Sequence, residues 1–146
     1  NKIKKTYLAL VEGRPKNKFG YIKEAIAKIK VNKIEKMDVI KNKEKNSITY
    51  YKTINSQGGL SLLEVYPKTG RTHQIRIHLL SQRCPILGDK KYKLLNQDNN
   101  KFEEINKKMH LHAKSISFKL NKKKYFLEAQ LPAHFKKTLK LYNFIL

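Results

Sequence analysis

The chain is poor in the residues that build covalent cross-links and membrane spans. Cys84 is the one cysteine among 146 residues, which excludes an intrachain disulfide framework and a CxxC metal motif. The sequence has no run of 18 apolar residues and no signal-peptide pattern, so we expect neither a membrane span nor secretion. A lone thiol also fits a reducing compartment, and we therefore predict a cytoplasmic protein.

Acidic residues are scarce as well, since 11 of them face 33 basic residues for a formal net charge of +22. A chain this basic suits a partner with a phosphate backbone. The basic residues are 29 Lys and only 4 Arg, beside 12 Asn, and Lys with Asn is also the composition that an AT-rich genome favours. The charge alone therefore supports RNA or DNA binding only weakly.

Arginine is rare but clustered. Arg71, Arg76 and Arg83 fall within 13 residues, and only Arg14 lies elsewhere. The planar guanidinium presents a fork that matches carboxylate and phosphate, whereas lysine is a flexible point charge. In a chain so biased towards lysine, the cluster indicates that fixed fork geometry is needed there.

Hydrophobic patterning predicts a strand-rich chain with helices at intervals. Strands are predicted at 6–13, 48–54, 60–66, 110–120 and 124–130, turns at 42–47, 55–59 and 121–123, and a final helix at 133–144 after Pro132. Segment 19–41 fits a short amphipathic helix or strand pieces, and 96–108 fits an exposed loop or short helix. The pattern predicts a single α+β domain over 1–146, with a mixed, mainly antiparallel sheet and flanking helices.

The arginine cluster lies in "KTGRTHQIRIHLLSQ", residues 68–82, which we predict to contain a helix over 72–83. Its length argues against a strand so soon after strand 60–66. The helix would place one stripe beside an apolar stripe of Ile75 and Leu79. The first stripe consists of His73, Arg76, Leu80 and Arg83. Segment 83–92 is turn-rich.

Three interpretations of this cluster are possible from the residues themselves. A metal site could draw on His73, His78, His110, His112 and Cys84, but no H-x-x-x-H pair occurs and carboxylates are few. The residues could simply face solvent. In the third interpretation the cluster is an anion or carboxylate clamp, with Arg76 one turn inside a helix whose N-terminal end attracts anions.

Two motifs in order carry a family resemblance. "TGRTHQIRIHL" followed by "PILGDKKY" resembles the signature of the RluA-like RNA pseudouridine synthases. The resemblance extends over almost the whole chain, because "KKTYLALVEG" (4–13), "SLLEVYPKTG" (61–70), "LHAKSISF" (111–118) and "AQLP" (129–132) are similar to other segments of that family. It implies the incomplete catalytic fold of such a synthase.

The resemblance implies an isomerase that converts uridine to pseudouridine in RNA, with ribosomal RNA as the expected substrate. In that family the uridine is flipped out of its stack, the glycosidic bond is broken, and the base is rejoined through carbon 5. No metal, nucleotide or redox cofactor is implied. No membrane partner is expected.

The resemblance also implies roles for particular residues. Arg76 is expected to pair with the nucleophilic aspartate, and Tyr7 to stack on the base and to handle the carbon-5 proton. Leu111 is expected to close the pocket. The remaining candidates are expected to bind substrate or RNA, or to orient the loop, and are Arg71, Thr72, His73, Gln74 and His78.

One departure from the family pattern concerns the nucleophile, an aspartate in an R-L-D-x-x-T-S-G motif that this chain lacks. Asp38, Asp89 and Asp98 have other contexts, and Asp89 is expected to hold a turn. We expect the motif upstream of Asn1, and with it an N-terminally truncated chain that also lacks a small S4-type domain and is inactive alone. The alternatives are a non-catalytic basic RNA-binding module on the same scaffold and a ribosome-associated structural protein.

Overall fold

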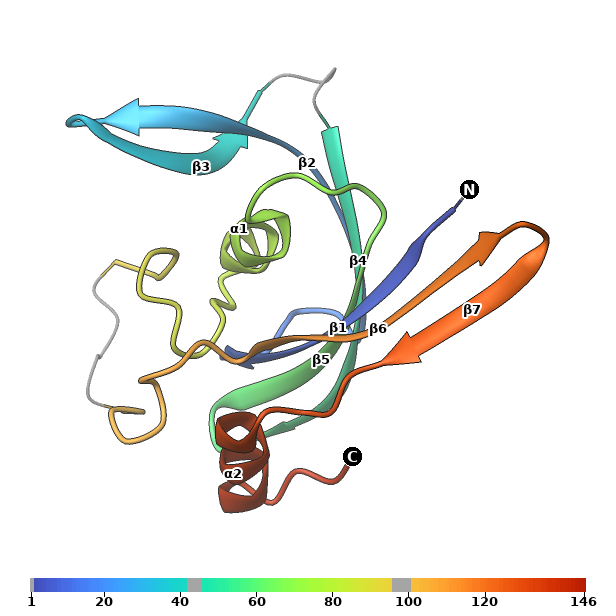
Figure 1. Cartoon of the computed structure of the whole chain (residues 1–146). Coiled ribbons are helices and arrows are strands. Elements are labelled where there is room, and N and C mark those ends of the chain that lie inside the picture. The colour runs from blue at the N-terminus through green and yellow to red at the C-terminus, as the bar shows by residue number, and fades with distance from the viewer. Residues whose placement is uncertain (1, 42–45, 96–100) are drawn as a thin grey trace.

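A computed structural model describes residues 2–41, 46–95 and 101–146. In this part of the chain seven strands form one sheet, and two helices pack beside it (Figure 1). In chain order the elements are β1 (Lys4–Glu12), β2 (Phe19–Val31), β3 (Ile34–Ile40), β4 (Asn46–Gln57), β5 (Leu60–Pro67), α1 (Gln74–Ser81), β6 (Leu111–Leu120), β7 (Lys123–Glu128) and α2 (Ala133–Leu141).

The sheet has the strand order β3-β2-β4-β5-β1-β6-β7, and every neighbouring pair is antiparallel. This confirms the predicted α+β class with a mainly antiparallel sheet. β1 and β5 lie near the middle of the sheet, and successive side chains are buried in each strand because both of their faces are covered. The apolar run is continuous in β1, whereas Ser61 and Glu64 interrupt it in β5. Among the described residues, no helix is long and apolar enough to cross a membrane.

Alternation along β1 divides the core between the two helices. Ala9 and Val11 belong to a buried cluster with Ile75 of α1. Leu8 and Leu10 point to the other face, where they pack in a second cluster with Phe135 of α2. Each fully buried side chain of this size contributes roughly 1.5–3 kcal/mol, so β1 holds both layers together.

Segment 19–41 forms two strands, and the short amphipathic helix considered for it is wrong. β2 pairs with β3 across a tight turn in which Asn32 and Lys33 both have positive φ, 50° and 65°. Two consecutive left-handed residues produce the backbone twist that suits a two-residue hairpin. Ile22, Ala25 and Ile26 are buried, a spacing that also fits a helix, and pairing of β2 with β4 decides the outcome.

Other boundaries shift by a few residues. β4 runs on to Gln57 with an irregularity between Thr53 and Asn55, so the turn is shorter than the predicted 55–59. The last helix ends at Leu141 rather than 144. Residues 101–108 form turns in which Phe102 is buried in the α2-side cluster rather than exposed. The predictions for 42–45 and 96–100, including Asp98, lie outside the described residues.

Candidate active site

The helix that carries the site begins later than its pattern predicts. α1 spans Gln74–Ser81, and His73 stands directly before it in the left-handed conformation (φ 56°, ψ 19°). Arg83 lies beyond the helix, also with positive φ (59°), so it does not share a helical stripe with Arg76. A left-handed residue other than glycine costs free energy, of order 1 kcal/mol or more, and such strain is concentrated at functional sites.

Gln74 fixes the loop before the helix. Its side-chain oxygen accepts hydrogen bonds from the Thr69 hydroxyl (2.7 Å) and the Arg71 backbone N–H (3.1 Å). Its amide nitrogen donates to the Ile48 carbonyl and the Thr49 hydroxyl, both at 3.0 Å. The side chain is buried, and its amide spans from the loop to β4. Of the two roles considered for Gln74, orienting the loop is favoured by these four hydrogen bonds.

His78 is likewise a buried structural group. Its Nε2 lies 3.4 Å from the Glu24 carbonyl, which can only accept, so Nε2 carries the proton. Nδ1 then accepts from the Thr49 hydroxyl at 2.7 Å. Burial lowers the pKa of His78 and keeps the ring neutral, an effect only partly opposed by the Glu24 hydrogen bond. His78 therefore ties α1 to β2 and β4 and is not exposed to a ligand.

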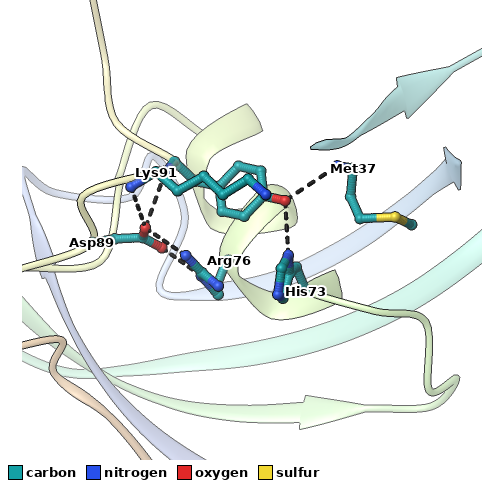
Figure 2. Close-up of polar contacts among 6 residues, drawn as sticks. Met37, His73, Arg76, Asp89 and Lys91 are labelled. Carbon is teal, nitrogen blue, oxygen red and sulfur yellow. Dashed lines mark hydrogen bonds and ion pairs between the residues drawn. The ribbon is translucent and has the colours of Figure 1, made fainter. Parts of the chain in front are cut away.

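Arg76 is held by a carboxylate from the same chain (Figure 2). Its Nε donates to Asp89 Oδ2 at 2.7 Å, and a terminal nitrogen donates to Asp89 Oδ1 at 2.8 Å. The Asp89 side chain is fully buried, and that of Arg76 is 17% exposed. Asp89, expected only to hold a turn, is therefore also a carboxylate partner of Arg76.

Asp89 also holds a turn, as expected. Its Oδ1 accepts the backbone N–H groups of Lys91 and Tyr92, both at 3.0 Å. Burial alone would raise the pKa of Asp89, but the hydrogen bonds from Arg76, Tyr92 and Lys91, together with the Arg76 charge, outweigh burial and lower it. The hydrogen bond to Asp89 and the Asp89 charge raise the pKa of Arg76 against the opposing effect of burial. The pair is therefore ionised at neutral pH.

Tyr92 connects this ion pair to two other elements. The Arg76 guanidinium lies over its ring, 4.6 Å from the centroid. Its hydroxyl accepts the Met37 backbone N–H of β3 (3.2 Å) and lies 2.8 Å from His73 Nδ1 (Figure 2). The hydroxyl therefore donates its own proton to the unprotonated Nδ1, and in the neutral ring the remaining proton lies on Nε2 of His73, which is left as a donor. This interlocking fixes the orientation of both His73 and Arg76.

Lys91→Gln is expected to raise the pKa of His73. Burial lowers this pKa first, and the charges of Arg76 and Lys91 lower it further, against an opposing effect of Asp89. Removing the Lys91 charge removes one of the effects that keep the imidazole neutral. NMR titration of the His73 ring protons would measure the change, and Lys90→Gln would serve as the neighbouring control.

A cavity of about 340 Å³ collects most of the predicted site residues. Six of the eight line it, namely Tyr7, Arg71, His73, Gln74, Arg76 and Leu111. The other two do not, since Thr72 is exposed outside the lining and His78 lies buried. Lys5 and Met109 also line the cavity, although neither was predicted. Its charged lining residues are Lys5, Arg71 and Arg76, all cations, so the cavity suits an anionic ligand.

Tyr7 enters this cavity next to an irregular strand pairing. The register between β1 and β6 shifts between Thr6 and Tyr7, because Thr6 pairs with Ser115 and Tyr7 with Ala113. Such bulges re-aim side chains and are over-represented beside active sites.

Within the described residues, no group of three or more His, Cys, Asp or Glu side chains could hold a metal ion.

The sequence profile of one family, described as RNA pseudouridylate synthase, matches residues 1–81. A relative from Rickettsia bellii (strain RML369-C), named ribosomal large subunit pseudouridine synthase C, is 41% identical over 139 residues. That alignment covers 93% of this chain and 44% of the relative. The chain belongs to the RNA pseudouridylate synthase family, and it spans less than half the length of that relative.

Further comparisons agree. Ribosomal large subunit pseudouridine synthase D of Borreliella burgdorferi is 34% identical over 131 residues, 90% of this chain and 39% of that protein. The solved structure of human RNA pseudouridylate synthase domain containing 4 superposes with a TM-score of 0.74 at 24% identity. The superposition covers 97% of this chain and 62% of the human chain, so the two proteins share the fold.

Proposed function

We propose that this chain is the larger part of a catalytic domain that isomerises uridine to pseudouridine in ribosomal RNA, in the cytoplasm. Membership of the family supports the reaction class, and the names of the relatives support ribosomal RNA as substrate. The observation that carries the proposal is the cationic cavity into which Tyr7, Arg76 and Leu111 converge from β1, α1 and β6.

Arg76 is proposed to hold the nucleophilic aspartate of the family motif. Two of its five N–H groups bind Asp89, which leaves three for a second anion in the cavity. A guanidinium whose position is already fixed by Asp89 and Tyr92 can hold that carboxylate without reorganising. Its charge would also keep the nucleophile ionised inside a partly desolvated pocket.

The cavity walls suit a flipped base. Tyr7 offers an aromatic face for stacking, and Leu111 with Met109 provides an apolar wall. His73 is neutral because burial lowers its pKa, and its Nε2–H can donate to a carbonyl or phosphate oxygen. Lys5 and the exposed Arg71 are placed to bind phosphates of the flanking nucleotides.

The test is a map of pseudouridines in ribosomal RNA from cells with and without the gene. We expect one or more pseudouridines to disappear on deletion and to return when the natural full-length gene is restored. Residues 1–146 alone should not restore them, since they carry no R-L-D-x-x-T-S-G motif. An unchanged map combined with tight RNA binding would instead support the non-catalytic RNA-binding module.

RNA binding is expected to weaken steeply with salt. The net charge of +22 and the cationic cavity imply that phosphate contacts dominate affinity. Each contact releases counterions, so the slope of log affinity against log salt should be about one unit per phosphate contacted. Titration of binding to a structured ribosomal RNA fragment from low to moderate salt measures this slope. A flat response would contradict the electrostatic part of the proposal.

A further inference from the structure

The β6–β7 hairpin presents an uncovered apolar face. Figure 1 shows the hairpin projecting from the sheet, with its tip away from both helices. Phe118 and Tyr125 are directly paired across the two strands, so their side chains share one face, and their rings stack with centroids 5.3 Å apart and planes 13° from parallel. By alternation, this hairpin face consists of Ile116, Phe118, Leu120, Tyr125 and Leu127.

The hairpin face is continuous with the candidate active site. Ile116 pairs with Lys5 of β1, which shares a face with Tyr7 two residues later. A second cavity of about 290 Å³ joins these residues, because Lys5, Tyr7, Ile116 and Leu127 all line it. Lys5 and Tyr7 line the cavity of about 340 Å³ as well. From Ala113 beside Tyr7 to Phe118 is five residues of strand, about 16 Å.

The chemistry of this face matches unpaired nucleotides. Aromatic rings on a sheet surface stack bases, and nearby cations bind the backbone. Lys123 supplies such a cation, with its Nζ 5.5 Å from the Tyr125 ring centroid, and Lys5 supplies another at the cavity. Leu120 and Leu127 are 50% and 58% exposed, which leaves apolar area for further base contact.

We propose that unpaired RNA nucleotides adjoining the target uridine stack along the hairpin face while the uridine itself occupies the cavity at Tyr7. This inference rests on the proposed function and narrows its substrate to a uridine in a single-stranded or unstacked segment. A continuous duplex could not place its bases on this face. The face acts in substrate binding, so the affected quantity is affinity rather than chemistry.

The opposite face of the hairpin provides matched controls. Phe126 pairs with Ser117 on that side and is 61% exposed. Lys124, adjacent in sequence to Lys123, pairs with Lys119 on that side, and both lysines are exposed. Exchanges at Phe118 and Phe126, or at Lys123 and Lys124, therefore change the same atoms on opposite faces of one hairpin.

The experiment measures binding of a fluorescein-labelled oligouridylate to the chain by anisotropy. Phe118→Leu and Tyr125→Leu keep an apolar, strand-compatible side chain and remove the ring. We expect each of these two substitutions to weaken RNA binding roughly fivefold or more. Lys123→Gln should also weaken binding. The controls Phe126→Leu and Lys124→Gln should bind within about twofold of the unmodified chain. Circular dichroism and thermal unfolding select the variants that remain folded.

The outcomes separate the inference from the proposed function. If the unmodified chain does not bind the oligouridylate, the inference falls, and the pseudouridine map in ribosomal RNA decides the proposed function separately. If it binds and Phe118→Leu binds equally well, or Phe126→Leu is as weak as Phe118→Leu, only the inference falls. Sedimentation would reveal a third outcome, in which Phe118→Leu dissociates a dimer without changing RNA affinity, and this would make the face an interface between copies.

Discussion

Asp89→Asn is expected to lower the free energy of unfolding by about 3 kcal/mol, because it leaves the guanidinium of Arg76 without its charged partner. The Asp89 carboxylate is fully buried and binds Arg76 through both oxygens. Asparagine keeps one acceptor oxygen for the turn but cannot form the charged fork. Arg76 retains some access to water, which places the loss at the lower end for a broken buried pair. Urea unfolding measures it, and the melting temperature should fall by roughly 6–12 °C.

The pH dependence identifies the ion pair as the source. The folded-state pKa of Asp89 is lowered from 3.8, so its stabilisation is fully present above that value and is lost as pH falls through the folded pKa. The stability difference between the unmodified chain and Asp89→Asn should therefore be constant near neutrality and shrink in acid. Asp38→Asn is the control, because the exposed Asp38–Lys36 pair at 3.8 Å should contribute at most about 1 kcal/mol. Equal losses from the two substitutions would contradict the assignment.

The sequence predicted correctly those parts of the fold in which the residue pattern fits only one kind of secondary structure. β1 and the β4–β5 hairpin have long apolar or β-branched runs and a Gly-Gly turn, and they were confirmed. Segment 19–41 was ambiguous because the i, i+3, i+4 spacing of Ile22, Ala25 and Ile26 fits a helix, while the charged residues between them also fit interrupted strand pieces. Only the pairing of β2 with β4, a tertiary contact, resolves such a segment.

The sequence predicted which residue types form the candidate site, but it did not predict which residues they bind. The clustered arginines indicated a carboxylate site, and the G-D-x-x-Y spacing marked Asp89 and Tyr92 as a turn. Nothing in the sequence shows that the Asp89 oxygens turn back towards Arg76, 13 positions earlier. Likewise, Gln74 and His78 look like solvent-facing helix residues until Thr49 of β4 supplies their buried partner. Polar residues that are satisfied across elements cannot be distinguished locally from exposed ones.

The two halves of the ion pair should differ in their effect on catalysis. Arg76 lines the cavity, whereas Asp89 binds Arg76 but does not line the cavity. Under the proposed function, a substitution at Asp89 acts on catalysis through the position of Arg76 and through the folded fraction. A substitution at Arg76 also removes the donors that meet the nucleophile. Comparing Arg76 and Asp89 variants at a temperature where both are folded therefore separates structural support from a role in the reaction.

Under the proposed function, Arg76→Lys in a form of the protein that carries the nucleophile motif is expected to reduce kcat for pseudouridine formation by about 10²–10³-fold, the usual cost of removing a preorganised donor. An ammonium cannot bind Asp89 and a second carboxylate with a planar fork at the same time. RNA affinity should change little, since the positive charge remains. The matched control is Arg83→Lys, because Arg83 is exposed beyond α1 and does not line the cavity. Single-turnover rates and RNA affinities are measured on the same preparations. If affinity falls as much as turnover, Arg76 contacts phosphate, and if Asp89→Asn slows turnover equally, Arg76 serves only the fold.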